Sequence, residues 1–517
     1  GPRDQALAAA LADIADGRYP DACRLYRALV ARDSADFVAW FGLGECQSKD
    51  NVVERDRASP SGWRFRSSYH SAVQAYRRAL RLIPSAHRAF GQLTRLSDLV
   101  FYTETNQARS GFTLAPDTQW YAAFPALDRD TLAFVPYPRN DVLAGKPDAT
   151  PATIAAAVAH NRAILRDITT EWVRAFPESP QAHEALALVL EGSGDLVDRQ
   201  PSELSALATV RRARGTAVAA GQRLRLAIAE IRLLTKLEDF GAARRLADST
   251  LDATSDSVPG AAAQLAGLAA LLGRAHRTAQ LLGGAAPDLT IEGQDGHIAV
   301  RPVALARAAF ALRGYAAVGA PAESIRVLAR RVNALIDAAV EPQGREAMRH
   351  ALLDHPTQWA LPLLRGRPPR RGTPGERYRR LVWALDHGDT VSIRATLDSL
   401  ERARADLRPG DVAISGTLLE ARVLLAIGDT GRATELIRRP LDALTTLGTG
   451  LLENVDQAAA LVRAMVLRAD LAGSRGDAAT ARRWAAAVIA LWQDADDDAI
   501  QAVVERMRSI AERPRRS

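Results

Sequence analysis

Several short runs in the sequence approach catalytic or ligand-binding motifs, and each lacks a residue that the chemistry needs. The run Gly-Lys-Pro at 145–147 has proline where a phosphate-binding loop requires serine or threonine. The pair His183-Glu184 lacks the second histidine of the helical zinc motif. The run Glu-Gly-Ser-Gly at 191–194 is one residue short of the nucleophile elbow Gly-x-Ser-x-Gly. The sequence therefore predicts no catalytic residue, no cofactor and no metal site.

The run Asp-Phe-Gly at 239–241 spells the magnesium-binding motif of protein kinases, but no His-Arg-Asp loop and no Gly-rich loop precede it. Phe240 and Ala243 fit the turn and second helix of a helical repeat instead. The nine histidines are scattered along the chain, as expected for surface groups and satisfied core groups. We therefore expect a protein that is not itself an enzyme.

The composition indicates a folded protein and excludes several classes. Hydrophobic residues make up 47% of the 517 residues and charged residues 25%, which excludes wholesale disorder. Two cysteines are too few for a disulfide-built scaffold or a four-cysteine metal site. The net charge of +7 rests almost wholly on arginine, a usage that a GC-rich genome produces without selection on partners, so we expect no nucleic-acid partner. No apolar run reaches the 18 residues that would indicate a membrane span.

Three C-terminal segments repeat one pattern, a Gly-Asp pair that follows an apolar-periodic stretch and precedes another. The glycine can end one helix in the left-handed conformation, and the aspartate can accept hydrogen bonds from the free N–H groups that open the next. Each segment therefore predicts a helix, a tight turn and an antiparallel helix. The pairs are Gly388-Asp389, Gly428-Asp429 and Gly476-Asp477.

The N-terminal part shows the same unit with more diagnostic residues. Trp40, Leu43 and Gly44 have the W-x-x-L-G spacing, and Ala72, Tyr76, Ala79 and Pro84 have the spacing A-x3-[FY]-x2-A-x4-P. With these residues the chain resembles the tetratricopeptide-repeat family. The resemblance implies an all-α superhelix of helical hairpins, an α-solenoid in which each hairpin buries its apolar face against its neighbours. Spacings of 40 and 48 residues between the C-terminal glycines exceed the family's 34 and predict longer helices.

Breaks in the helical periodicity divide the chain. We expect N-terminal repeats over 1–100 with an insertion at 48–67, an aromatic and proline-rich insertion over 101–152, and central repeats over 153–364. A basic, proline-rich linker is expected at 365–376 and C-terminal repeats over 377–517. Within the central repeats, residues 287–301 alternate apolar and polar side chains around Asp295-Gly296, which predicts a β-hairpin, the one sheet-like piece of the chain.

The two cysteines lie at mirrored positions of one predicted hairpin. If the chain turns near Ser34, positions that face each other sum to roughly 68, so Cys23 lies opposite residue 45 and beside Cys46. Two outcomes are open: a disulfide, or two buried thiols in a helix interface. A disulfide would indicate an oxidising compartment.

A second resemblance concerns the setting of the chain. The run 60–70 that leads into the helix ending at Pro84, and the later Tyr137-Pro138 loop, are similar to the C-terminal repeat regions of bacterial eukaryotic-like serine/threonine protein kinases. The resemblance implies a sensor or docking region that follows a kinase domain, often beyond a membrane helix. It also implies an extracytoplasmic, periplasmic location, whereas without it we expect the cytoplasm. The chain begins Gly1-Pro2 and not with Met, so we expect a piece of a longer protein, in which a membrane span can precede it.

The leading hypothesis is a non-catalytic helical-repeat module that regulates or positions a signalling protein. Its partner is expected to be a protein or peptide, with a small-molecule ligand as a further option. The alternative is a structural subunit or adaptor of a multiprotein assembly. The candidate contact residues lie on the first helices of the hairpins and in the insertions: Phe41, Glu45, Trp63, Arg88, Arg95, Trp120, Tyr121, Tyr137 and Glu184.

Overall fold

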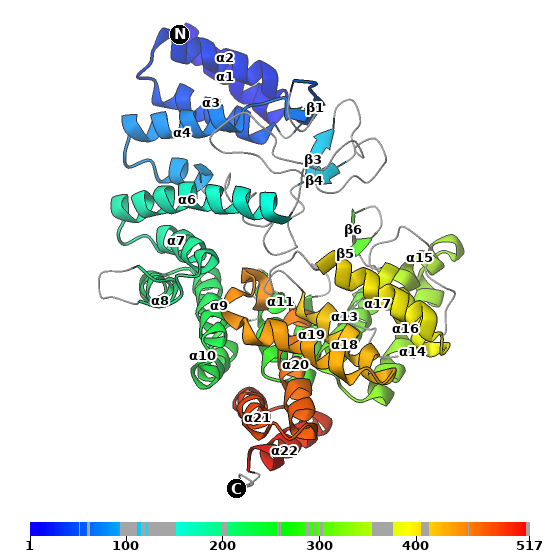
Figure 1. The fold of residues 1–517 in the computed structure, drawn as a ribbon. Helices are drawn as coiled ribbons and strands as arrows, with labels where there is room; N and C mark the ends of the chain where they lie inside the picture. The colour runs from blue at the N-terminus through cyan, green and yellow to red at the C-terminus, as the bar shows by residue number, and fades with distance from the viewer. Residues whose placement is uncertain are drawn as a thin grey trace. The chain divides into compact units, whose positions relative to one another are not determined.

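The computed structural model consists of two compact units, Gly1–Thr216 (unit 1) and Ala217–Ser517 (unit 2). The structure describes residues 1–50, 52–58, 63–93, 111–114, 120–122, 151–198, 204–255, 258, 260–285, 290–293, 296–299, 303–353, 376–404, 413–452 and 454–512. Both units are built mainly of helices that follow one another as hairpins (Figure 1). The all-α, helical-hairpin class is therefore confirmed, while the finer division into five segments stays a prediction.

Unit 1 contains consecutive helices that pack on their sequence neighbours. The helices are α1 (Pro2–Ala15), α2 (Tyr19–Arg32), α3 (Phe37–Lys49), α4 (Tyr69–Leu82), α6 (Pro151–Ala175), α7 (Pro180–Ser193) and α8 (Ala206–Thr216), and residues 87–93 are also helical. The alanines of the repeat spacing, Ala72 and Ala79, are both fully inaccessible. Tyr76 and Trp172 are buried as well.

A four-stranded sheet joins the two insertions of unit 1. The first insertion forms β1 (Val52–Arg55) and β2 (Trp63–Phe65), and the second forms β3 (Gly111–Leu114) and β4 (Trp120–Ala122), in the order β2-β1-β3-β4. The central pair β1 and β3 is parallel, with Val52 opposite Thr113. The expectation that the chain has one sheet-like piece is therefore wrong. Pairing between strands about 60 residues apart has no local sequence signal, unlike a hairpin turn.

Unit 2 contains further hairpins and the predicted β-hairpin. Its helices are α9 (Ala220–Lys236), α10 (Phe240–Ala253), α11 (Ala261–Leu271), α12 (Ala275–Ala285), α13 (Val303–Val318), α14 (Ala322–Ala339), α15 (Pro342–Leu353), α16 (Glu376–Asp386), α17 (Thr390–Arg404), α18 (Ile414–Ala426), α19 (Thr430–Asp442), α20 (Val455–Ser474), α21 (Ala478–Trp492) and α22 (Asp498–Ala511). Short 3-10 helices η5 (Leu444–Thr446) and η6 (Thr449–Leu452) follow α19. Strands β5 (Thr290–Gly293) and β6 (Gly296–Ala299) pair antiparallel, which confirms the hairpin.

The repeated Gly-Asp pairs make the turns that the sequence predicts. Gly388, Gly428 and Gly476 have φ angles of 66°, 83° and 79°, in the left-handed region that glycine adopts without strain. Asp429 and Asp477 cap the helices that follow, because their carboxylates accept hydrogen bonds from the backbone N–H groups of residues 432 and 480. Local chemistry therefore fixes where each C-terminal hairpin turns.

Unit 2 does not form an open row of hairpins. Helix α20 packs on α11 and α13, α21 packs on α10, and η6 packs on α9 and α11. The indole Nε1 of Trp492 donates to the carbonyl oxygen of Leu271 at 3.1 Å, and the carboxylate of Asp496 accepts from the backbone N–H groups of His276 and Arg277 at the start of α12. Packing of each hairpin on its sequence neighbours is therefore only part of what stabilises this unit, in which long-range contacts close the fold.

Candidate functional site

Helix α3 is held against α2 and α4 by two glycines in its middle. A β-carbon on Gly42 would lie 2.2 Å from the ring of Tyr26, and one on Gly44 would lie 2.6 Å from the ring of Tyr76. Any side chain at either position would collide with a buried tyrosine. The helices therefore approach closely here, and the residues of α3 on either side of the glycines are held in place.

A group of aromatic and basic side chains, which we call the Phe41 face, lies on α3 and on helix 87–93. Phe37 and Phe41, one turn apart on α3, stack with their ring centroids 6.1 Å apart. The guanidinium carbon of Arg88 lies 5.4 Å from the centroid of the Phe41 ring, within the range of a cation–π contact. Phe37 and Phe41 are partly exposed and Arg88 is exposed. The Phe41 face consists of these three residues.

The buried residues Tyr76 and Glu45 hold the Phe41 ring in position. The Tyr76 ring meets Phe41 edge-on at 5.6 Å, and its hydroxyl donates to the Glu45 carboxylate at 2.7 Å. The second carboxylate oxygen of Glu45 lies 3.1 Å from the Lys49 ammonium group. Burial, followed by the Glu45 charge, raises the pKa of the Tyr76 hydroxyl above its ordinary value, so this donor stays protonated. The Glu45 carboxylate is thus buried, binds Tyr76 and Lys49 within the protein, and orients the Tyr76 ring.

Arg88 forms no ion pair with any residue in the described part of the chain, unlike several other arginines of unit 1. Arg3 pairs with Asp36 at 2.7 Å and Arg66 pairs with Asp50 at 2.8 Å. The planar guanidinium of Arg88 lies on an aromatic ring and keeps its N–H donors for other acceptors. The Phe41 face therefore combines apolar surface with an available cation.

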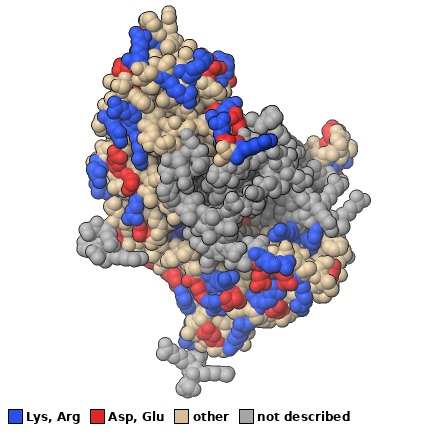
Figure 2. Space-filling model, turned by 45° about the horizontal axis from the view of Figure 1, so that its top comes forward, with Lys and Arg blue, Asp and Glu red and all other residues tan. Residues whose placement is uncertain are grey.

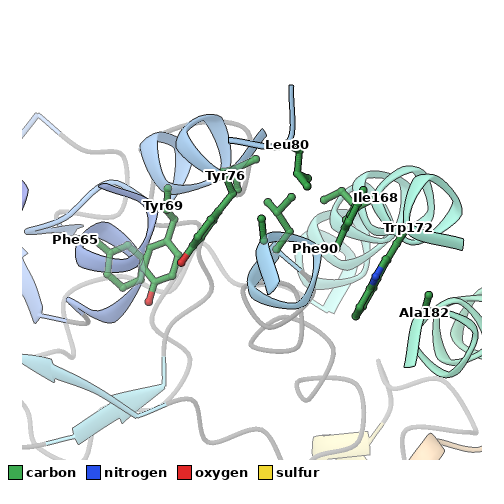
Figure 3. Packing of buried hydrophobic residues seen from close by; sticks show 12 residues of the cluster. Phe65, Tyr69, Tyr76, Leu80, Phe90, Ile168, Trp172 and Ala182 are labelled. Carbon is green, nitrogen blue, oxygen red and sulfur yellow. The ribbon is translucent and has the colours of Figure 1, made fainter. Parts of the chain in front are cut away.

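Helix 87–93 is fixed by an aromatic cluster that it shares with α6 (Figure 3). Phe90 stacks on Trp172 with ring centroids 6.0 Å apart and an interplanar angle of 7°. His87 stacks on Phe176 at 4.7 Å and accepts a hydrogen bond from the Trp172 indole at 2.8 Å. The position of Arg88, between His87 and the buried Ala89, depends on this cluster.

A disulfide and an ion pair hold the C-terminal end of α3. A disulfide joins Cys23 on α2 to Cys46 on α3, with the two Cα atoms 5.5 Å apart, which is the first of the two outcomes left open by the sequence. At the end of α3, Asp50 accepts two hydrogen bonds from the Arg66 guanidinium, each 2.8 Å long. This pair anchors the first insertion, and with it the sheet, to the helix that carries the Phe41 face.

The structure brings together three of the predicted contact residues, Phe41, Glu45 and Arg88. The others lie elsewhere: Trp63 belongs to β2, Trp120 and Tyr121 belong to β4, where they pair with Thr113 and Phe112, and Glu184 lies partly buried on α7. Arg95 and Tyr137 lie outside the described residues. Sequence reasoning missed Phe37 and His87. The four-residue spacing of Phe37 and Phe41 would have indicated the first, but nothing local indicates the contact between His87 and Trp172, which are 85 residues apart.

Charged side chains of both signs are interspersed on the face that Figure 2 shows. Among the described residues, no group of three or more His, Cys, Asp or Glu side chains could hold a metal ion. None of the described helices combines the length and apolarity that a membrane crossing requires.

Comparisons with known proteins give likeness to solved structures alone. No protein-family model matches the sequence, and no curated protein matches it either. The Naa15/Naa10 structure bound to HypK-THB is 14% identical over 98% of this chain and 73% of that chain, with a TM-score of 0.23. The TPR domain of P58(IPK) is 10% identical over 92% and 99%, with a TM-score of 0.20, and yeast Tom70 is 12% identical over 98% and 95%, with a TM-score of 0.25. Because these TM-scores are low, we draw no conclusion from the likeness, and the description of the fold rests on the helices and contacts of this structure alone.

Proposed function

We propose that unit 1 is a non-catalytic module that binds a segment of a partner protein on the Phe41 face. The observation that carries the proposal is the exposed guanidinium of Arg88, which lies on the Phe41 ring and has no ion pair within the described residues. Aromatic residues and arginine are enriched at protein interfaces. A partner segment with an apolar side chain next to a hydrogen-bond acceptor fits this surface.

The rigidity of the Phe41 face supports the same proposal. Gly42 and Gly44 lock α3 against buried tyrosines, and the disulfide of Cys46 ties the helix to α2. A face that is held in one conformation loses little conformational entropy on binding, which favours affinity. In unit 2, by contrast, helices α11 and α13 are covered by α20, so these surfaces are already used within the protein.

We further propose that the module is the sensor or regulatory region of a bacterial signalling protein such as a serine/threonine kinase. The support is the resemblance of the run 60–70 and of the later Tyr137-Pro138 loop to kinase-associated repeat regions, together with the disulfide. A disulfide between Cys23 and Cys46 persists in an oxidising compartment, which favours an extracytoplasmic location.

The test is capture of partners with matched variants. The double variant Phe41→Ala/Arg88→Ala removes the ring and the cation, while Arg24→Ala removes an exposed arginine of α2 that pairs with Asp21, three residues earlier on the same helix. We expect the double variant to lose partners that the wild type and Arg24→Ala both retain. Because Phe41 packs on Tyr76, the double variant should also unfold at a lower temperature, so circular dichroism must show that it is folded at the temperature of the assay. Identical partner sets for all three proteins would refute the role of the Phe41 face. The variant Trp120→Ala/Tyr121→Ala tests the second insertion in the same way.

The alternative is a structural subunit of an assembly, in which the same surfaces are permanently buried by neighbouring subunits. Light scattering separates the two functions, because a monomer at micromolar concentration disfavours a permanently assembled subunit.

A further inference from the structure

His87 connects three successive helical elements of unit 1 through one chain of hydrogen bonds. Its Nδ1 lies 2.8 Å from the indole Nε1 of Trp172 on α6. Its Nε2 lies 3.4 Å from the hydroxyl oxygen of Ser179, which caps α7 by accepting from the backbone N–H of Ala182 at 3.3 Å. The ring also stacks on Phe176, directly after α6. The beginning of helix 87–93 is therefore held by its contacts with α6 and the start of α7.

The partners fix the protonation state that this arrangement needs. An indole N–H can only donate, so Nδ1 of His87 must accept and must carry no proton. The proton of the neutral ring is then on Nε2, which points at Ser179 and can donate to its hydroxyl oxygen. Protonation of the imidazole would place an N–H on Nδ1 opposite the indole N–H, and two donors would face each other. The bond from Trp172 is thus available only to the neutral ring.

The connection matters for the Phe41 face because His87 is followed directly by Arg88. The Arg88 guanidinium lies 5.4 Å from the Phe41 ring centroid, and Phe90 lies flat against Trp172. When the bond between His87 and Trp172 is lost, the start of helix 87–93 loses a tie to α6, and the Arg88 side chain loses its fixed place over Phe41.

We propose that His87 is a proton-sensitive tie that keeps the Phe41 face in its binding conformation when the imidazole is neutral and releases it when the imidazole is protonated. The expected change in partner binding rests on the proposed function, whereas the expected loss of the bond between His87 and Trp172 rests on the hydrogen bonds alone. The hydrogen bond from Trp172 exists only while the imidazole is neutral, so acid, which protonates the ring, weakens the tie. A module exposed to a changing external pH would thereby bind its partner more weakly in acid.

The direct contacts of the ring are with Trp172, Phe176 and Ser179, none of which is charged. The charged and titratable groups nearest in sequence to these contacts are Arg88 on the same helix, the exposed Glu171 and Arg174 on α6, the exposed Glu178, and His183 on α7. His183 is buried and its Nε2 lies 2.8 Å from the carbonyl oxygen of Pro177, so its own titration must be separated from that of His87 by experiment.

The matched variant is His87→Asn. The Oδ1 of asparagine lies as many bonds from the backbone as the Nδ1 of histidine, so it can accept from Trp172, but it does not titrate. His183 remains in this variant and serves as the internal control. A second variant, Trp172→Phe, removes the donor and keeps an aromatic ring in the cluster.

The first measurement needs no partner. In ¹H–¹⁵N spectra of the full chain, the indole N–H signal of Trp172 is identified by its absence in Trp172→Phe. We expect this signal to shift between pH 7.5 and 5.5 in the wild type and to stay in place in His87→Asn. The protection factors of the amides of residues 87–93, which correct for the slower intrinsic exchange at lower pH, should fall about fivefold over the same range in the wild type alone, the equivalent of one hydrogen bond of about 1 kcal/mol. An indole signal that does not move, or that moves equally in His87→Asn, overturns the proposal.

The second measurement uses a partner captured by the wild type. Its affinity should fall about fivefold from pH 7.5 to 5.5 for the wild type and stay within twofold for His87→Asn. If the indole signal titrates but the affinity of both proteins changes equally, the coupling to the Phe41 face is refuted. If no partner is captured, the proposed function fails, while the indole and exchange measurements still decide the role of His87.

Discussion

The closed packing of unit 2 can be tested at Gly267, which lies inside α11. A β-carbon at this position would lie 2.5 Å from the carbonyl oxygen of Leu452 in η6. Ordinary contacts begin at 3.4 Å, so the two elements would have to separate by about 0.9 Å. The obstacle is a backbone atom, which cannot rotate away as the end of a side chain can. The variant Gly267→Ala therefore measures whether η6 really packs on α11.

Two opposing effects decide the sign of the change in stability. Alanine favours a helix interior over glycine by about 1 kcal/mol, which would stabilise α11 by itself. Overpacking of a closely fitted interior costs about 1–3 kcal/mol, and a displacement of backbone against backbone belongs at the upper end. We therefore expect Gly267→Ala to lower the free energy of unfolding by about 2 kcal/mol, which corresponds to a drop in Tm of about 4 °C for a unit of this size.

The assay is urea unfolding followed by tryptophan fluorescence, with hydrogen exchange to locate the effect. The control is Gly284→Ala in α12, where an added β-carbon meets no atom within 4 Å, and where we expect no loss of stability. Exchange should accelerate in α11 and η6 in Gly267→Ala and not in the control. If Gly267→Ala is as stable as the wild type or more stable, the close contact between α11 and η6 is refuted.

Three further predictions concern stability. Replacing Cys23 and Cys46 by serine should lower the free energy of unfolding of unit 1 by about 3 kcal/mol, the chain-entropy value for a loop of this length. Urea unfolding measures the change, and reductant should destabilise the wild type by a similar amount. A wild type that is equally stable with and without reductant would contradict a bond between the two cysteines. Burial raises the pKa of Tyr69 and Tyr76, so at high pH these hydroxyls ionise in the unfolded chain before they ionise in the folded protein. The free energy of unfolding should therefore be constant below about pH 10 and fall above it by about 1.4 kcal/mol per pH unit for each tyrosine. Absorbance at 295 nm that shows both tyrosines ionising near pH 10 in the folded protein would refute their burial. Asp496→Ala removes the carboxylate that accepts from the first turn of α12 and should cost about 1 kcal/mol in thermal unfolding, and an unchanged Tm would show that this long-range cap is absent.

The candidate site was accessible to sequence reasoning only in part. Phe41, Glu45 and Arg88 follow from the repeat pattern, because the W-x-x-L-G and Ala/Tyr spacings assign residues to helices and to helix faces. The pattern does not say which polar groups are used internally. Glu45 is a candidate contact residue in the sequence, but the structure directs its carboxylate to Tyr76 and Lys49, since a buried carboxylate needs partners. The stacking of Arg88 on Phe41 likewise depends on how two hairpins meet.

The sequence by itself determined the local features of this protein. The turns at Gly388, Gly428 and Gly476 follow from the left-handed conformation of glycine and the capping oxygen of the next aspartate, which act within a few residues. The proximity of Cys23 and Cys46 follows from the geometry of a single hairpin.

Only the tertiary structure decided which distant elements meet. The parallel pairing of β1 with β3, the packing of α20 on α11 and the bond between Trp172 and His87 join residues far apart in the chain. Such contacts depend on the summed angles and lengths of all the hairpins between them, and small local differences accumulate along the chain until no short pattern specifies the result.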